Sequence, residues 1–409
     1  MYIQTSSGNF YSYLRHTNEI VGGLVEASTA PWSFTPNVQF LSMPNIDSFI
    51  LGVTEQCNLR CTYCCYSGSY PNNRTHSAKY MESYDIDSIF DFIENISPDR
   101  AIRISFYGGE PLLQYKLIQY AVDLGYKKWG NKVTFSISTN GVLLTPAIID
   151  WIIANNIELA ISIDGAEEYH DKHRIDISGN GSFSKIKSAL SYIKANYSKS
   201  YWDITIMMTL PSFKSIGEIA ESWHNEPLLK SLSPTMINGL APNFASGVEM
   251  VEYDEVCSAY TNLLDLYHKH PDWNVLRVFF NQCIAYWKDR PIISPHGSVP
   301  MATCMPINTK LFIDSDLQIG VCEKISDKYR IGDIKTGINW EKANSIVYEY
   351  YNKRVERCRH CPSVRMCDMC LTAIEYTDEQ WDILCHNEQV YTRVFMYLFC
   401  EMAERGMII

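Results

Sequence analysis

Hydrophobic positions repeat in two alternating patterns along residues 47–240. Short, mostly apolar runs predict buried strands over 48–53, 101–108, 132–138, 157–164, 202–210 and 233–239. Between them, apolar residues spaced three or four apart predict helices over 84–96, 116–129, 146–156, 183–196 and 216–225. Strands that alternate with helices pair in parallel through crossover connections. About six such repeats predict an α/β fold, a partial (β/α)6 TIM-like barrel, in which chemistry lies where strands end and loops begin.

The two ends of the chain carry other patterns. Residues 8–15 and 20–27 resemble the strands of a short hairpin, residues 253–268 are amphipathic like a helix, and residues 310–322 form a second hairpin-like stretch. We therefore expect four parts: a lead-in segment (1–46), a barrel (47–250), a bridging region (251–300) and a cysteine-rich tail (301–409). The lead-in segment is interpreted as packed strands, with a peptide-recognition hairpin as the alternative.

Composition limits the class of protein. The chain has 409 residues, of which 46% are hydrophobic, enough for a packed core. No apolar run reaches the roughly 20 residues that span a bilayer, and the first residues lack the features of a signal peptide. We therefore expect a cytoplasmic protein without a membrane partner. The formal net charge of -11 argues against nucleic acid as a partner, because phosphate binding needs a dense basic face.

The fourteen cysteines are unevenly distributed. The reducing cytoplasm disfavours structural disulfides, so their positions need another explanation. Cys257, Cys283 and Cys400 are scattered, and the first two are interpreted as core thiols. The others fall in two groups, one from 57 to 65 and one from 304 to 385. Clustering of this kind predicts metal ligation.

The first group follows the predicted strand at 48–53. It contains Cys57, Cys61 and Cys64 in a C-x-x-x-C-x-x-C array. Three thiolates in so short a loop can hold one face of a cubane iron-sulfur cluster, which in other proteins is held by four cysteines. One iron then stays open to a small chelating ligand. A zinc knot or a set of buried thiols is the alternative. Cys65, the next cysteine, is interpreted as a small buried residue.

Polar motifs follow the next predicted strands. Gly108 and Gly109 let the backbone approach a ligand closely, and the Glu110 carboxylate could accept from an ammonium group. The turn at 138–141 (Ser-Thr-Asn-Gly) carries side chains that could reach ribose hydroxyls. Further on, Arg174 ends a charged run and could bind a carboxylate in two-pronged fashion. Each motif lies at a strand end, where an α/β barrel places its chemistry.

The order of these motifs resembles a known family. CNLRCTYC, YGGEP, STNG, SIDG, HDKHR and GNGSF follow one another as in radical S-adenosylmethionine (SAM) enzymes with a C-terminal SPASM domain, such as sulfatase-maturing enzymes and maturases of ribosomally made peptides. The resemblance runs from Ser48 to Cys385. It implies that Cys57, Cys61 and Cys64 hold a [4Fe-4S] cluster whose open iron binds SAM. It further implies SAM contacts at Tyr63, Gly108, Gly109, Glu110, Asn140, Ser162 and Arg174.

The second cysteine group has two interpretations. Its two C-x-x-C pairs could form a zinc ribbon, although seven cysteines are too many for one zinc ion and too few for two all-thiolate sites. The resemblance to SPASM domains instead implies two auxiliary [4Fe-4S] clusters. By that match the outer cluster takes Cys358, Cys361, Cys367 and Cys385, and the inner cluster takes Cys304, Cys322 and Cys370. The fourth ligand of the inner cluster stays open between Cys283, a substrate thiolate and none.

One acidic residue stands beside this group. Glu323 directly follows Cys322, at a position where the sulfatase-maturing relatives carry an aspartate. Glutamate is one methylene longer and can act in the same way, so Glu323 is the candidate catalytic base. A polar residue near the cluster without catalytic duty is the alternative.

These observations predict an enzyme. We expect a radical SAM/SPASM maturase that abstracts hydrogen from a peptide through a 5'-deoxyadenosyl radical and installs an oxidative modification, a thioether or carbon-carbon cross-link in a ribosomally synthesised peptide. A formylglycine-generating sulfatase maturase is the alternative within the class, and a zinc-binding interaction protein is the alternative from another class. Three [4Fe-4S] clusters and SAM are the expected cofactors. The expected partners are a peptide or protein substrate and an electron donor such as flavodoxin or ferredoxin.

Overall fold

The computed structural model describes residues 1–26, 30–31, 46–70, 73–239, 249–290 and 309–407. Contacts divide the chain into two compact units. The first comprises residues 1–39, 247–304 and 344–409, and the second comprises 40–246 and 305–343. Residues 305–343, which we expected in the cysteine-rich tail, therefore belong to the unit that contains the strand-helix repeats.

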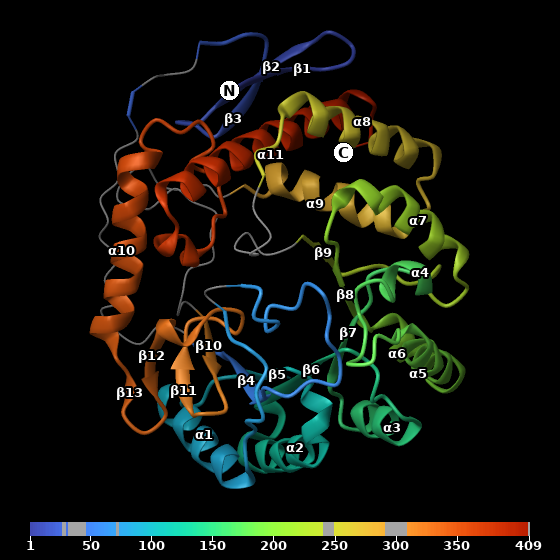
Figure 1. Cartoon of the computed structure of the whole chain (residues 1–409), viewed down its shortest axis with the longest axis vertical. Helices are drawn as coiled ribbons and strands as arrows, with labels where there is room; N and C mark the ends of the chain where they lie inside the picture. Colours follow the sequence, from blue (N-terminus) through green and yellow to red (C-terminus); the bar gives the residue numbers. More distant parts are fainter. Residues whose placement is uncertain (27–29, 32–45, 71–72, 240–248, 291–308, 408–409) are drawn as a thin grey trace. The chain divides into compact units, whose positions relative to one another are not determined.

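A mostly parallel sheet forms the core of the second unit (Figure 1). Within the described residues it has ten strands, in the order β13-β12-β11-β10-β4-β5-β6-β7-β8-β9. The six strands from β4 to β9 pair in parallel. They are β4 (Ser48–Thr54), β5 (Ile102–Gly108), β6 (Val133–Thr139), β7 (Glu158–Ser162), β8 (Thr205–Thr209) and β9 (Met236–Asn238). All six strands predicted from the apolar runs are confirmed.

Four later strands extend this sheet beyond β4. β10 (Lys310–Ile313) pairs in parallel with β4, and β11 (Gln318–Gly320), β12 (Arg330–Asp333) and β13 (Gly337–Ile338) follow in antiparallel order. The hairpin predicted over 310–322 is confirmed as β10 and β11. Because β10 lies against β4, the turn after β11 belongs to the same unit as the cysteine loop that follows β4.

Helices connect the parallel strands. They are α1 (Ser83–Ile96), α2 (Tyr115–Trp129), α3 (Pro146–Ala154), α4 (Glu167–His170), α5 (Phe183–Asn196), α6 (Ser198–Trp202) and α7 (Ile216–Asn225). The five longer ones match the predicted helices. In Figure 1, α1, α2 and α3 lie outside the sheet, and the loop after β4 lies on its other side. The sheet is thus covered by helices on one face and carries the cysteine loop on the other.

Local sequence explains where these helices start. At the start of α1, Glu82 and Asp85 form a capping box, which satisfies the first free N–H groups of the helix. In α3, the Thr145 side chain accepts from Ile148 N, and Pro146 occupies the first turn, where its missing N–H costs nothing. The apolar stripe of α1 then packs on the sheet through residues that are fully buried, such as Ile86, Ile89 and Ile93.

The first unit combines a small sheet with long helices. β1 (Tyr2–Gln4), β2 (Phe10–Leu14) and β3 (Glu19–Gly22) pair in antiparallel order, which confirms the predicted N-terminal hairpin. The helices are α8 (Tyr253–Lys269), α9 (Asn274–Lys288), α10 (Trp340–Cys358) and α11 (Asp378–Glu404). α8 and α9 both pack against α11. No helix among the described residues is long and apolar enough to cross a membrane.

The hairpin is fixed to the end of α11. Thr5 Oγ1 and Tyr11 OH donate to the Glu404 carboxylate at 3.1 and 2.8 Å, and Ser6 Oγ donates to Glu401 at 2.9 Å. These side chains come from the turn between β1 and β2 and from β2 itself. The described strands β1 to β3 of the lead-in segment are therefore packed into the first unit, and a role of the hairpin in peptide recognition stays a prediction.

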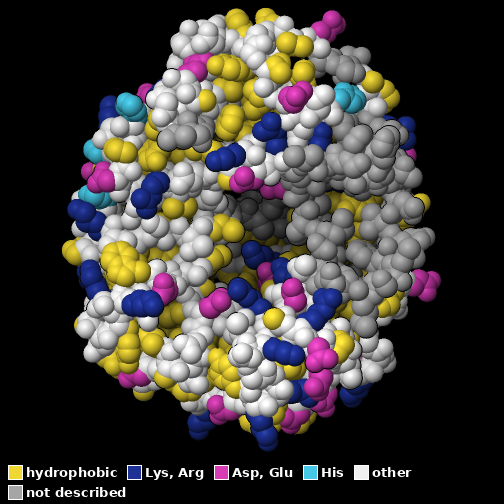
Figure 2. All heavy atoms as spheres, turned by 180° about the vertical axis from the view of Figure 1, so that it is seen from behind, with side chains coloured by type: hydrophobic (Ala, Val, Ile, Leu, Met, Phe, Trp, Pro, Cys, Tyr) yellow, Lys and Arg dark blue, Asp and Glu magenta, His cyan; other side chains and the backbone are white. Residues whose placement is uncertain are grey.

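Charged side chains are mixed on the surface. Figure 2 shows Lys and Arg side chains interspersed with Asp and Glu side chains over the described part of the face that it draws.

Candidate functional site

The three cysteines of the first group lie in the loop that follows β4. Backbone bonds tie this loop to the ends of neighbouring elements: Gly109 N donates to Thr54 O at 2.9 Å, and Glu110 N donates to Gln56 O at 2.8 Å. On the other side, Arg60 N donates to Ile175 O at 2.6 Å. The loop is therefore held between the end of β5 and the segment after α4.

The three thiols influence one another's ionisation. Burial raises the pKa of Cys57 to about 12, and charges on Cys61 and Cys64 add to this rise. Burial also raises the pKa of Cys61 to about 11. Backbone N–H groups point at two of the sulfurs, with Leu59 N 3.4 Å from Cys57 Sγ and Tyr66 N 3.4 Å from Cys64 Sγ. Buried thiols that disfavour each other's ionisation need a cationic partner to become thiolates.

The donor set is made of thiols. Among the described residues, no group of three or more His, Cys, Asp or Glu side chains is arranged to hold a metal ion. In an iron-sulfur cluster each cysteine binds a different iron, so the sulfurs need not surround one metal ion. Whether such a cluster fits is therefore judged by the type of donor present. Cys57, Cys61 and Cys64 come from one loop and influence one another, and iron would supply the positive charge that they need.

Gly108 and Gly109 have a structural role that the sequence did not reveal. A Cβ on Gly108 would lie 2.1 Å from Thr54 O, and one on Gly109 would lie 2.2 Å from Gln56 O. Gly108 also has a φ of 137°, which side chains disfavour. The glycines thus let the end of β5 pack directly against the backbone of the cysteine loop. Their contact with a ligand stays a prediction.

Glu110 is buried and occupied by protein donors. Its carboxylate accepts from Leu112 N at 3.1 Å, Thr139 Oγ1 at 2.7 Å and Asn140 N at 2.8 Å. Burial raises its pKa to about 7, although these hydrogen bonds act in the opposite direction. The side chain therefore joins the end of β5 to the end of β6 and fixes the turn that carries Asn140. The predicted contact between Glu110 and the SAM amino group is not tested by this geometry.

The polar turn after β6 reaches the cysteine loop, and its predicted contact with ribose hydroxyls stays a prediction. Asn140 Nδ2 lies 2.7 Å from Asn58 Oδ1 and 3.8 Å from Cys57 Sγ. The same side chain accepts from Val142 N at 3.0 Å, which stabilises the turn. Ser162 ends β7, beside Met207 of β8. The ends of β6 and β7 therefore hold the residues that the motif order singled out.

Arg174 is buried, although the run around it suggests a solvated face. Its Nε donates to Asp164 Oδ2 at 2.7 Å and its Nη2 donates to Asp164 Oδ1 at 3.1 Å. Tyr63 OH also donates to Asp164, and the guanidinium carbon lies 5.5 Å from the centre of the Tyr63 ring. Thr209 N donates to the same carboxylate at 2.9 Å. The guanidinium thus binds a carboxylate in two-pronged fashion, and that carboxylate belongs to the protein.

Three residues of this region were missed at the level of sequence. In the sequence, Asp164 stands out only as a member of the SIDG motif. Its role as a common hydrogen-bond acceptor depends on donors from three other segments, Tyr63, Arg174 and Thr209. His170 is fully buried, accepts from Asp164 N at 3.3 Å and lies 3.0 Å from Ser182 Oγ. His76 Nε2 lies 3.7 Å from Cys64 Sγ, and this contact raises the pKa of the imidazole. The only available signal was their presence in or near the motifs.

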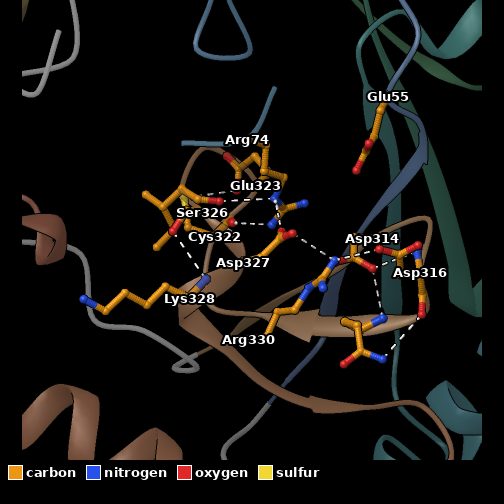
Figure 3. A network of polar contacts seen from close by, with 12 residues as sticks. Glu55, Arg74, Asp314, Asp316, Cys322, Glu323, Ser326, Asp327, Lys328 and Arg330 are labelled. Atoms are coloured by element: carbon orange, nitrogen blue, oxygen red, sulfur yellow. Dashed lines mark hydrogen bonds and ion pairs between the residues drawn. The ribbon is translucent and has the colours of Figure 1, made fainter. Parts of the chain in front are cut away.

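Glu323 lies in the turn after β11, beside Cys322 (Figure 3). Its Oε2 is 3.1 Å from Lys310 Nζ and 3.6 Å from Cys322 Sγ. Burial alone would raise the pKa of Glu323, but the charges on Lys310 and Lys324 outweigh it, so the pKa lies below its usual value. The side chain is therefore held as a carboxylate, the form that a general base requires.

The turn that carries Glu323 is fastened to the cysteine loop and its continuation. Tyr66 OH donates to Glu323 O at 2.8 Å. Arg74 donates to Ile325 O at 3.2 Å and to Cys322 O at 3.4 Å, and its guanidinium carbon lies 4.0 Å from the centre of the Phe312 ring. Figure 3 shows Arg74 pointing at this turn. These bonds bring Cys322 and Glu323 to the side of the sheet that holds the first cysteine group.

Four cysteines of the second group come together in the first unit. A charge on Cys358 raises the pKa values of Cys361, Cys367 and Cys385, in addition to the larger effect of burial. Burial takes the pKa of Cys361 to about 12 and that of Cys385 to about 11. Their donor set consists of thiols, as an iron-sulfur cluster requires. These four are the residues that the resemblance assigns to the outer cluster.

The ligands predicted for the inner cluster fall in different places. Cys322 belongs to the second unit and Cys370 to the first, and Cys304 lies outside the described residues. Cys283 is buried in α9, near Tyr260, and its pKa is raised by burial. Cys65 is in contact with the Cys64 thiol. The predicted inner set and its fourth ligand therefore stay predictions.

Known proteins resemble this chain in sequence. Residues 51–222 match the model of the radical SAM superfamily. A cysteine-type anaerobic sulfatase-maturating enzyme from Clostridium perfringens strain 13 is 25% identical over 379 residues, 87% of this chain and 97% of that enzyme. A serine-type enzyme from Bacteroides thetaiotaomicron is 31% identical over 144 residues, 34% of each chain. The radical SAM cyclopropyl synthase TigE from Paramaledivibacter caminithermalis is 26% identical over 160 residues, 37% of this chain and 33% of that enzyme.

Solved structures resemble this chain in fold. Native anSMEcpe with bound AdoMet superposes with a TM-score of 0.65 at 20% identity, covering 89% of this chain and 100% of that one. The same protein with bound AdoMet and the Cp18Cys peptide gives a TM-score of 0.63 at 20% identity, covering 89% and 99%. The α/β fold with its mostly parallel sheet is therefore shared with a protein whose solved structure contains bound AdoMet.

Proposed function

We propose that this chain, which belongs to the radical SAM superfamily and is homologous to the anaerobic sulfatase-maturating enzymes, oxidatively modifies a side chain of a peptide. We favour a cross-link, a thioether or carbon-carbon bond, in a ribosomally synthesised peptide. Because the chain is an enzyme, a zinc-binding interaction protein is no longer a candidate. The similar proteins include sulfatase-maturating enzymes and a cyclopropyl synthase, so the bond that this chain forms belongs to the proposal.

One observation carries the proposal. The three thiols of the loop after β4 lie among polar groups from the ends of β6 and β7, including Asn140 beside Cys57 and Arg174 with its partner Asp164 near Cys61. A [4Fe-4S] cluster held there would supply the electron that cleaves SAM into methionine and a 5'-deoxyadenosyl radical. The strand-end groups would bind the amino acid and ribose parts of SAM.

The roles of individual residues follow their positions. Arg174 and Asp164 hold Tyr63 in place, so that the backbone at Tyr63 is available to the adenosyl group. Glu110 fixes the turn that presents Asn140 to the ribose. We assign SAM contacts to Tyr63, Gly108, Gly109, Glu110, Asn140, Ser162 and Arg174. The neutral pairing of Arg174 with Asp164 keeps this region free of excess charge before the ligand arrives.

Glu323 is the proposed base. Lys310 holds it as a carboxylate, and the bonds from Tyr66 and Arg74 fix the turn on which it lies. A carboxylate here can remove the proton that must leave when a substrate radical is oxidised and a new bond closes. The removed electron needs an acceptor, and the tail cysteines provide candidates.

We assign these tail cysteines to a SPASM domain with two auxiliary [4Fe-4S] clusters, and the strand-helix repeats to a partial (β/α)6 barrel. The gathering of Cys358, Cys361, Cys367 and Cys385 supports the outer cluster. Cys304, Cys322 and Cys370 are the proposed ligands of the inner one. A flavodoxin or ferredoxin is the proposed electron donor, since the cleavage of SAM consumes an electron that must come from outside the chain.

A formylglycine-generating sulfatase maturase is the second candidate. The observation that favours it is coverage: the match to a cysteine-type sulfatase-maturating enzyme includes 97% of that enzyme. Glu323 would then act on a cysteine or serine of the sulfatase. The residues that start the radical chemistry are the same for both candidates.

The two candidates are separated by their products. Anaerobically reconstituted enzyme is incubated with SAM, a reductant and either a cysteine-containing sulfatase peptide or the peptide encoded beside its gene, and the products are analysed by mass spectrometry. A cross-link removes one pair of hydrogen atoms, whereas formylglycine formation from cysteine removes one pair of hydrogen atoms and, through hydrolysis with release of sulfide, also replaces sulfur by oxygen. Formation of 5'-deoxyadenosine with neither peptide modified would contradict the assigned substrate class.

A further inference from the structure

A buried arginine of the first unit is not explained by the fold. Arg354 lies on α10, one turn before Cys358, and only 1% of its surface is exposed. Its Nη2 donates to Cys367 Sγ at 2.8 Å. The charge on the Cys358 thiol also acts on Arg354. The guanidinium is therefore in contact with one of the four cysteines that gather in this unit and is influenced by a second.

The other contacts of Arg354 are neutral. Its Nη1 donates to Tyr350 OH and to Met369 O, the latter at 3.5 Å, and the guanidinium carbon lies 5.2 Å from the centre of the Tyr350 ring. Among the described residues, its Nε has no hydrogen-bond partner. Glu388 faces the same Cys367 thiol, yet no salt bridge between described residues includes Arg354. A buried cation in such surroundings costs several kcal/mol unless an anion offsets it.

Among the described residues, the anion that accepts a hydrogen bond from Arg354 is the Cys367 thiolate, whereas the Asp368 and Glu388 carboxylates act on Arg354 through charge without forming an ion pair with it. When four cysteines bind a [4Fe-4S] cluster, their thiolates and the cluster together carry net negative charge, and reduction makes this charge more negative. A cation that donates N–H to a ligating sulfur stabilises the reduced state more than the oxidised one, because the attraction grows with the charge. The effect is large in a buried site, where water does not screen it.

We infer that Arg354 is a positioning residue of the outer cluster, which fixes the Cys367 thiolate by an N–H···S bond and raises the reduction potential of the cluster. The inference rests on the proposed function, because it needs a cluster at Cys358, Cys361, Cys367 and Cys385. A higher potential favours the transfer of an electron from the substrate radical to this cluster. Arg354 would thereby promote the oxidative half of the reaction without touching SAM or substrate.

The chain offers a matched control on the same helix. Arg357 lies one turn further along α10, is partly exposed and forms ion pairs with Asp378 and Asp382. It also acts on Cys385, so that its charge is in the same neighbourhood. Because its charge is already paired and lies near water, its removal should have little effect on the cluster. Arg354 and Arg357 therefore differ in burial and pairing but not in charge.

The test is a redox titration of the full-length, anaerobically reconstituted enzyme, followed by electron paramagnetic resonance. In Arg354→Met, one of the cluster signals should show an equilibrium constant of reduction that is at least about tenfold lower, equal to about 59 mV for one electron. The reduction potential of Arg354→Lys should lie between those of Arg354→Met and the wild type, because lysine keeps the positive charge but lacks the planar guanidinium with its several N–H donors. Arg357→Gln should stay within about threefold of the wild type. Equal potentials in Arg354→Met and the wild type would overturn the inference.

Iron analysis separates this inference from the proposed function. Loss of iron in Cys385→Ala supports the outer cluster, and unchanged iron would refute the cluster and the inference with it. Unchanged potential in an iron-replete Arg354→Met refutes only the role of Arg354. Should that variant lose iron, resonance Raman spectra of the wild type in H2O and D2O provide the answer: a deuterium shift of an iron-sulfur stretch supports the N–H···S bond, and its absence overturns it.

Discussion

The two cysteine groups differ in the charged residues that surround their thiols. Beside the loop after β4, the buried Arg174 is already paired with Asp164 through two hydrogen bonds. In the first unit, the buried Arg354 has no carboxylate within salt-bridge distance among the described residues and donates to a thiol. A paired cation leaves its region close to neutral, as suits a site that receives a charged ligand, whereas an unpaired cation suits a permanent anion. The comparison suggests that three cysteines serve ligand chemistry and four serve electron transfer.

The largest expected effect separates these two tasks. Cys61→Ala should abolish the reductive cleavage of SAM, because the loop then retains only two thiolates for its cluster. Cys361→Ala should keep substantial cleavage of SAM but lose the modified peptide, because its cluster accepts electrons later. Both quantities are measured by chromatography of 5'-deoxyadenosine and mass spectrometry of the peptide. Equal loss of cleavage in the two variants would remove the functional difference between the groups.

The pairing of Arg174 is the next element to test. Asp164→Asn leaves the guanidinium buried without a carboxylate, and we expect the free energy of unfolding to fall by about 3–5 kcal/mol. The measurement is urea denaturation of the apoprotein. Glu158→Gln is the control, because its ion pair with Arg103 is half exposed and should contribute at most about 1 kcal/mol. A loss below that limit for Asp164→Asn would show that Arg174 does not depend on its partner.

The close packing of the loop after β4 gives a smaller effect. Gly108→Ala places a methyl group 2.1 Å from Thr54 O at a φ of 137°, so the strand end or the loop must move. We expect a cost of about 1–3 kcal/mol in stability and weaker SAM binding by isothermal titration. Gly130→Ala, whose Cβ would meet open space at a positive φ, is the control for strain alone. Equal effects of the two substitutions would mean that the contact with the loop is unimportant.

Acid pH should weaken the second unit through His170. Burial, with a contribution from Arg174, lowers the pKa of His170 to about 3. Between pH 3 and the usual value of about 6.5, the unfolded chain therefore binds a proton that the folded chain does not. Stability is fully present above about pH 6.5 and falls as the pH decreases, by about 1.4 kcal/mol per pH unit for this group.

The check is chemical denaturation at several pH values. His170→Gln should give a shallower pH dependence than the wild type in this window, whereas His268→Gln, which changes an exposed residue of α8, should leave the slope unchanged. If His170→Gln retains the full slope, the acid sensitivity arises from other groups.

Much of the fold followed from local patterns. The strands and helices between residues 47 and 240 were predicted because each buries a face whose spacing is visible in the sequence. The placement of the motifs that carry Asn140 and Arg174 at strand ends was predicted because an α/β barrel places its chemistry there. By contrast, the place of residues 305–343 depends on β10 pairing with β4, a contact between distant segments that no local pattern encodes.

The missed residues share the same cause. Asp164 and Arg354 are ordinary charged residues in sequence, and their roles arise from partners brought together by folding. Gly108 and Gly109 were interpreted as positions where the backbone approaches a ligand, whereas the structure shows a close approach to Thr54 and to the cysteine loop, and the ligand contact stays a prediction. The burial of His170 and Arg174, at the two ends of a charged run, could not be deduced from the sequence, because charged residues are usually exposed.

The central claim is that Cys57, Cys61 and Cys64 hold a cluster of their own. It is tested most directly by iron and sulfide analysis of the anaerobically reconstituted wild type and of the variant in which all three cysteines are alanine. We predict that the variant loses the equivalent of one four-iron cluster, about four iron atoms per chain, and retains the tail clusters. Unchanged iron and sulfide in that variant would contradict the account.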